Sequence, residues 1–133
     1  CLLMNQKLRI LIIEDEESIR DSLQWFLEDL GHEVVALTVP HECDVYNGQP
    51  CTRQKSCTDA LIIDQHLPGM LGLDFVEQLT VRRCKGIISN MLLISGDATS
   101  VDMQKANALG ISVIQKPMTF DFLEDWLRKV NPV

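Results

Sequence analysis

Short apolar runs recur along the chain, and most of them end in polar or charged residues. The runs consist mostly of aliphatic residues, and each is short enough to form a strand buried inside a parallel sheet. They fall within residues 7–17, 32–39, 59–65, 88–97 and 110–117.

Helical patterns separate most of these runs. In the first helical pattern, apolar residues recur at helical spacing and Gly31 follows as a C-terminal stop. In the last helical pattern, Thr119 is a suitable N-cap. The alternation of strands and helices predicts an α/β fold with a doubly wound, five-stranded parallel sheet. The helical patterns cover residues 17–31, 72–83, 99–110 and 119–130.

The pattern fails between the second and third runs. Residues 40–58 are polar, are interrupted by Pro40, Gly48 and Pro50, and contain three cysteines. Such a stretch lacks the apolar periodicity of a helix that packs on a sheet. We expect this irregular, cysteine-containing segment to stand in place of much of the second helix.

Composition and charge narrow the choice of function. Hydrophobic residues make up 46% of the 133 residues, which suits one folded domain, placed at residues 7–130 between tails at 1–6 and 131–133. No apolar run is long enough to span a bilayer and the N-terminus lacks a signal-peptide layout, so we expect a cytoplasmic domain without a membrane partner. The net charge of −7 disfavours direct nucleic-acid binding, which needs a basic surface.

Chemically active residues follow the predicted strands. Ligands of doubly wound sheets bind beyond the carboxyl ends of the strands, so the residues at those ends should converge. Three carboxylates, a hydroxyl and an ammonium group would then meet at one edge, which suits Mg²⁺ and a phosphoryl group. These residues are Glu14 and Asp15 after the first run, Asp64 after the third, Ser95 after the fourth and Lys116 after the fifth.

The set resembles the receiver domain of two-component response regulators, which has a flavodoxin-like fold. In LIIDQHLPGMLG, Pro68 and Gly72 follow Asp64 by four and eight residues, as in the phosphoacceptor segment of that family. LIIEDEE matches its acidic pair, LLISGD its hydroxyl residue followed by a small one, and QKP its Lys-Pro pair. The resemblance extends over about residues 7–130.

The resemblance implies a phosphorylation-controlled switch. Asp64 would accept a phosphoryl group from a sensor histidine kinase or a phosphotransfer protein in a Mg²⁺-dependent reaction, while Ser95 and Lys116 would bind phosphoryl oxygens. Catalysis would consist of positioning and charge neutralisation. The domain would catalyse only its own phosphorylation and dephosphorylation and would not otherwise be an enzyme. The sequence does not identify its output partner or a fused output domain.

The same resemblance implies a set of metal ligands. Asp15, Asp64 and the main-chain carbonyl of His66 would hold Mg²⁺, and Glu14 would act on the metal through water. Asp97, two residues after the serine, lies on the rim of the expected site with the His66 side chain. Either rim residue could affect hydrolysis of the acyl phosphate.

One position departs from the family pattern. Receivers usually have Tyr or Phe three residues before the lysine, where the ring acts as a packing switch, and this chain has Val113. Valine has no ring to move between buried and exposed positions, which leaves output through that residue in question. The weakly apolar helix over residues 99–110 could still reorganise, because an element with few buried contacts is labile.

The cysteines form a second departure. Cys43, Cys51 and Cys57 lie in the irregular segment near His41, and the fold should bring Cys57 towards Cys84 on the face opposite the phosphorylation site. Thiolates with an imidazole suit a structural metal such as zinc or an iron–sulfur cluster, but the spacing matches no standard zinc pattern. A disulfide and free thiols remain the other interpretations.

Two other functions compete with the phosphoacceptor hypothesis. One is a pseudo-receiver, an interaction module whose cysteine segment senses metal or redox state. The other is a small hydrolase with an aspartate nucleophile, such as certain phosphatases, but these have a second aspartate where this chain has His66. The chain also lacks a P-loop, so nucleotide hydrolysis is not expected.

Overall fold

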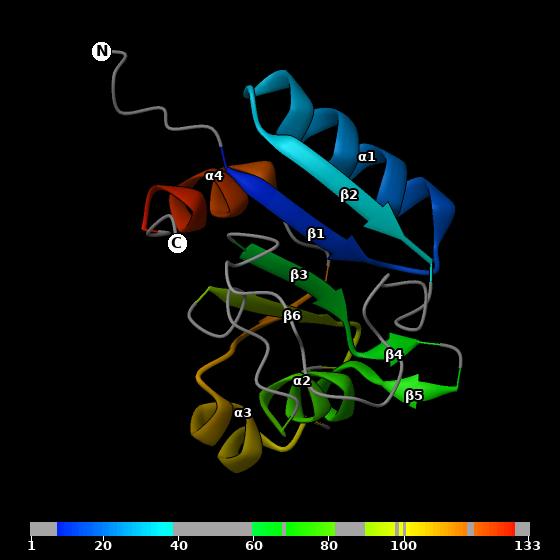
Figure 1. Cartoon of the computed structure of the whole chain (residues 1–133), viewed down its shortest axis with the longest axis vertical. Helices are drawn as coiled ribbons and strands as arrows, with labels where there is room; N and C mark the ends of the chain where they lie inside the picture. The colour runs from blue at the N-terminus through cyan, green and yellow to red at the C-terminus, as the bar shows by residue number, and fades with distance from the viewer. Residues whose placement is uncertain are drawn as a thin grey trace.

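Five parallel strands form the sheet that the apolar runs predict. We describe a computed structural model over residues 8–38, 60–67, 69–81, 90–97, 99, 101–116 and 119–129. The strand order is β2-β1-β3-β6-β7, so the chain crosses over between non-adjacent strands as doubly wound sheets do (Figure 1). The strands are β1 (Arg9–Ile13), β2 (Glu33–Leu37), β3 (Ala60–Asp64), β6 (Met91–Ser95) and β7 (Ser112–Gln115).

The three central strands are buried on both faces, which explains their unbroken apolar sequence. β3 and β6 are buried along their whole length, and β1 is exposed only at Arg9. Alternate side chains of each strand enter two separate clusters, one on each face of the sheet. In β3, for example, Leu61 and Ile63 join one cluster while Ala60 and Ile62 join the other.

Two helices cover each face of the sheet (Figure 1). Leu23 and Leu27 of α1 pack with Leu123 and Leu127 of α4 on one face, and residues of α2 and α3 pack on the other. The longest of these helices has 13 residues, and none in the described ranges combines the length and apolar character needed to cross a membrane. The helices are α1 (Glu17–Asp29), α2 (Gly72–Val81), α3 (Met103–Leu109) and α4 (Phe120–Arg128).

The ends of the helices agree only partly with the sequence prediction. The hydroxyl of Thr119 accepts a hydrogen bond from the Phe122 N–H at 3.1 Å, so this residue caps α4 as expected. The helix predicted from residue 99 begins instead at Met103, because the carboxylate of Asp102 accepts from the Lys105 N–H and caps α3 there. α3 is therefore shorter than its sequence pattern suggested.

A small hairpin that the sequence did not predict follows β3. Its strands β4 (His66–Leu67) and β5 (Met70–Leu71) are antiparallel, and Gly69 between them has a φ of 83°, a conformation that favours glycine. The hairpin returns the chain to the end of β3, where the Gly72 N–H donates to the Gln65 carbonyl at 2.8 Å. A Cβ atom at residue 72 would lie against the Asp64 carbonyl oxygen, so the spacing between Asp64 and Gly72 reflects close backbone packing.

Candidate functional site

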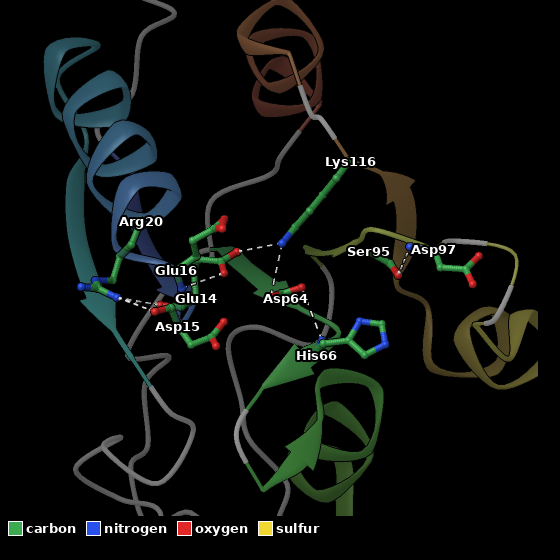
Figure 2. A network of polar contacts seen from close by, with 9 residues as sticks. All are labelled: Glu14, Asp15, Glu16, Arg20, Asp64, His66, Ser95, Asp97 and Lys116. Carbon is green, nitrogen blue, oxygen red and sulfur yellow. Dashed lines mark hydrogen bonds and ion pairs between the residues drawn. The ribbon is translucent and has the colours of Figure 1, made fainter.

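The residues that follow the strands meet at one edge of the sheet (Figure 2). Asp64 ends β3, Ser95 ends β6, and Glu14 and Lys116 directly follow β1 and β7. Asp64, Glu14 and Ser95 are buried, and burial is unusual for the two acids among them, so this edge is a polar site enclosed by the apolar core.

Three carboxylates lie close together in this site. One carboxylate oxygen each of Glu14, Asp15 and Asp64 falls within 4.8 Å of the other two. Acids at this separation repel one another unless a cation lies among them. Oxygen ligands of this kind fit Mg²⁺, which binds one or two protein carboxylates and retains several waters.

Lys116 supplies one cation to the cluster. Its Nζ lies 3.4 Å from Asp64 Oδ2 and 3.6 Å from Glu14 Oε2, so one ammonium group bridges the ends of β1 and β3. Burial alone would lower the pKa of Lys116, but the charges of Asp64 and Glu14 outweigh burial and raise that pKa. Lys116 therefore remains charged at neutral pH.

Glu14 is the most perturbed acid of the cluster. Its pKa is raised to about 7 on balance: burial is the largest cause and nearby Asp64 adds to it, whereas the hydrogen bond from the Glu16 N–H and the charge of Lys116 act in the opposite direction. Its second oxygen, Oε2, is buried without a hydrogen-bond partner in the described part of the chain. A buried carboxylate oxygen left in this state fits a site that a metal-bound water would complete.

The hairpin places His66 beside the nucleophile candidate. The His66 N–H lies 3.4 Å from Asp64 Oδ1, a long hydrogen bond that turns the main chain of His66 towards Asp64. Its imidazole is exposed and points away from the acidic cluster in Figure 2. The main chain and the side chain of this residue can therefore have separate roles.

Ser95 and Asp97 lie on the other side of Asp64 from Glu14 and Asp15 (Figure 2). The buried hydroxyl of Ser95 accepts a hydrogen bond from the Asp97 N–H at 3.0 Å. Asp97 is exposed, and its carboxylate accepts a hydrogen bond from the Thr99 hydroxyl at 2.6 Å. The strand end thus holds the serine oxygen in a fixed position while the aspartate remains on the rim.

Sequence reasoning missed three polar residues that support the site. Arg20 of α1 donates to main-chain carbonyls of the acidic loop, and the side-chain oxygen of buried Gln65 accepts from the Leu73 N–H at 2.9 Å. The amide of Gln115 donates to the Gly96 carbonyl at 2.6 Å and to the Lys116 carbonyl at 3.3 Å. Each contact involves the main chain, which a pattern of residue types does not reveal.

The remaining sequence predictions concern residues away from the acidic cluster or outside the described part of the chain. Val113 is half-buried on β7 and packs against the core, so no aromatic ring occupies that position. The predicted domain boundaries and the segment of residues 40–58 lie outside the described residues. The same holds for the predicted cysteine cluster, whose members are Cys43, Cys51, Cys57 and Cys84.

Comparison with known proteins identifies the family. The response regulator receiver domain model matches residues 10–128, and the chain belongs to this family. The chain is 30% identical over 124 residues to the sensory/regulatory protein RpfC of Xanthomonas campestris pv. campestris, covering 92% of this chain and 16% of RpfC. It is 30% identical over 118 residues to the two-component response regulator PhoP of Pseudomonas aeruginosa, covering 88% of this chain and 48% of PhoP.

Solved structures agree with this assignment. A CheY-like response regulator receiver domain from Methylobacillus flagellatus superposes with a TM-score of 0.76 at 25% identity, covering 95% of this chain and all of that one. The non-phosphorylated HemR receiver domain from Leptospira biflexa has the same fold, with a TM-score of 0.76 at 21% identity over 96% of this chain and 98% of that one. The predicted family and the predicted α/β receiver fold are confirmed.

Membership defines what this domain does in general. Receiver domains are the signalling phosphoacceptors of two-component systems, they bind Mg²⁺ at an acidic pocket, and they interact with histidine kinases or phosphotransfer proteins. The chain has such an acidic cluster at the expected edge of its sheet. It spans about a sixth of the length of RpfC, and receivers are often fused to output domains.

Proposed function

We propose that Asp64 is the phosphoacceptor of this domain. The observation that carries the proposal is the position of its carboxylate, which lies within 4.8 Å of carboxylate oxygens of Glu14 and Asp15 and 3.4 Å from the ammonium group of Lys116. An Asp64 oxygen would bond to phosphorus while the phosphorus–nitrogen bond of a donor phosphohistidine breaks. The electron pair of that bond stays on the imidazole, which takes a proton from solvent, and the product is an acyl phosphate.

Asp15, Asp64 and the His66 carbonyl would hold Mg²⁺, with Glu14 acting through a water molecule. Their fit to the metal is supported by the close acid oxygens and by Glu14 Oε2, which has no hydrogen-bond partner among the described residues. When bound, the metal would neutralise charge on the phosphoryl oxygens. The acids of this chain contribute by orienting their oxygens towards one point before the donor arrives.

Ser95 and Lys116 would bind the phosphoryl oxygens from the other side. The Ser95 oxygen already accepts from the Asp97 N–H, so its own hydrogen remains to be donated to a phosphoryl oxygen. Lys116 would exchange part of its contact with Asp64 and Glu14 for the more highly charged phosphoryl group. The rim residues His66 and Asp97 would then influence how water and donors reach the acyl phosphate.

Labelling with a small phosphodonor tests this proposal. Acetyl phosphate with Mg²⁺ should label the wild-type domain, as measured by intact mass, and should not label Asp64→Asn, which lacks the nucleophilic oxygen. Equal labelling of Asp64→Asn would show that a different residue is the acceptor. The pseudo-receiver alternative has no observation in its favour, because the described site retains the acids, the hydroxyl and the lysine.

A further inference from the structure

Two cationic side chains approach the acidic loop from opposite sides (Figure 2). Lys116 contacts the carboxylates, whereas Arg20 contacts the main chain behind them. We infer that Arg20 is a positioning residue for the metal site: it fixes the loop between β1 and α1 so that Glu14 and Asp15 present their carboxylates to the cation. The inference rests on the proposed Mg²⁺ site and adds a residue to it.

The contacts of Arg20 define this role. Its Nη1 donates to the Glu14 carbonyl at 3.0 Å and, more weakly, to the Asp15 carbonyl at 3.5 Å. Within the described part of the chain, its side-chain contacts are to these carbonyls and not to a carboxylate. The guanidinium therefore acts on the path of the main chain and does not neutralise an acid directly.

The loop needs such a restraint because it is short and carries like charges. The Glu14 N–H donates to the Leu37 carbonyl at 3.0 Å, which ties the start of the loop to β2. Asp15, the next residue, is exposed, and within the described ranges its hydrogen bond is the one that its carbonyl accepts from Arg20. By holding the carbonyls of Glu14 and Asp15, Arg20 restricts the backbone torsions of the loop and thereby the positions of the Cβ atoms from which the two carboxylates project.

A role of Arg20 through its charge and a role through positioning the loop predict opposite changes in Mg²⁺ affinity when Arg20 is removed, which makes the inference testable. A positive charge near the loop repels Mg²⁺, so if Arg20 acted through its charge alone, its removal would strengthen Mg²⁺ binding. If Arg20 holds the loop, its removal weakens binding although the site becomes more negative. Partners that orient metal ligands typically contribute about tenfold or more to affinity.

The test is a Mg²⁺ titration of the whole chain without any phosphodonor, followed by amide NMR shifts and tryptophan fluorescence. Arg20→Met keeps the aliphatic stem and should weaken Mg²⁺ binding about tenfold. Arg20→Lys keeps the charge, but its side chain is one bond shorter and should not reach both carbonyls, so its Mg²⁺ affinity should lie between those of Arg20→Met and wild type. Arg9→Met is the matched control, because it removes the same charge at the other end of β1 and should leave Mg²⁺ affinity within about twofold or slightly tighter.

The outcomes separate the two proposals. Unchanged or tighter Mg²⁺ binding by Arg20→Met, in a variant whose thermal unfolding stays cooperative, would overturn the role of Arg20 and leave the metal site intact. Wild-type protein with no Mg²⁺-dependent shifts near Glu14, Asp15 and Asp64 would instead overturn the metal site itself. If Arg20→Met does not fold, Arg20→Lys decides the question, since wild-type affinity in that variant would contradict a role for the two-carbonyl contact.

Discussion

The two halves of the site are held by different parts of the fold. The acidic half, which consists of Glu14, Asp15 and Asp64, grows out of the central strands β1 and β3. In the outer half, Ser95 ends β6, Asp97 lies in the loop after it, and Lys116 follows the edge strand β7. Side chains of β7 are exposed at its two ends and half-buried between them, whereas those of β3 are buried throughout.

This difference indicates how the work of the site is divided. Acids that repel one another must be held together before a cation binds, and the rigid backbone of the buried strands β1 and β3 contributes to this. Lys116 is 24% exposed on a flexible stem and can follow a phosphoryl group as it arrives. Substitutions should therefore affect stability in the acidic half and rates in the outer half.

Gly72→Ala should have the largest effect on stability. The added Cβ would meet the Asp64 carbonyl oxygen, a backbone atom that cannot move without shifting β3. We expect a loss of about 3 kcal/mol in the free energy of unfolding, measured with urea. Gly96→Ala, in the outer half, is the matched control: a Cβ added there would meet no atom within 4 Å, so a change within about 0.5 kcal/mol is expected.

Equal losses in the two glycine variants would break the comparison. It would mean that the loop after β6 is as tightly packed as the turn before α2. A stable Gly72→Ala variant with normal Mg²⁺ binding would show that the hairpin can shift without disturbing Asp64. Either result would remove the argument that the acidic half is built into the backbone.

Glu14 should make the metal-free domain less stable as pH rises. Its pKa is raised from the ordinary 4.5 to about 7 by burial, so between these values the folded state keeps a proton that the unfolded state has lost. Stability therefore falls through this window, and the penalty is fully present above about pH 7. Relative to Glu14→Gln, wild type should lose about 3 kcal/mol between about pH 4.5 and about pH 8.

Urea unfolding at several pH values measures this difference. The raised pKa of Lys116 gives no competing trend, because its contribution is lost only above its ordinary value of 10.5. Mg²⁺ should reduce the difference by favouring the charged form of Glu14. A difference between wild type and Glu14→Gln that stays constant with pH would show that the pKa of Glu14 is not raised in the folded state.

Lys116→Met should separate metal binding from phosphorylation. Because Lys116 pairs with Asp64 and Glu14, it competes with Mg²⁺ for the charge of the same two carboxylates, and its removal should tighten Mg²⁺ binding. Labelling by acetyl phosphate at saturating Mg²⁺ should nevertheless slow by about fivefold to tenfold, the ratio that roughly 1 kcal/mol gives. Faster labelling alongside tighter Mg²⁺ binding would exclude a phosphate-binding role for this lysine.

The sequence was sufficient to predict the sheet and the meeting of its strand ends. In a doubly wound fold, residues that follow apolar strands, such as Asp64 and Lys116, lie at the carboxyl edge of the sheet. Their positions at the ends of the apolar runs were therefore enough to predict that they lie close together. Thr119 was recognisable as a cap because its chemistry is local. The receiver family followed from the spacing of these residues, and the family match confirms it.

Other features depend on geometry that no residue pattern carries. The hairpin after β3 consists of strands of two residues each, too short to show a period. Arg20 has the sequence context of an ordinary surface residue of α1, because its partners are carbonyls present in every residue. The pKa of Glu14 is raised because its side chain is buried, whereas neighbouring Asp15, an acid in the same loop, is exposed. The sequence does not show which of the two is buried.

Asp97→Asn should have the smallest effect, and it tests the outer half at its rim. The substitution keeps the N–H that donates to Ser95, so it removes charge without altering the serine. The carboxylate is exposed, and its repulsion of an anionic donor is screened by salt. Labelling by acetyl phosphate should speed up about twofold at low ionic strength and match wild type at high ionic strength. Asp29→Asn, the same change at the far end of α1, should leave the labelling rate unchanged. An equal gain in rate for Asp29→Asn would show that the effect comes from the net charge of the domain and not from the position of Asp97.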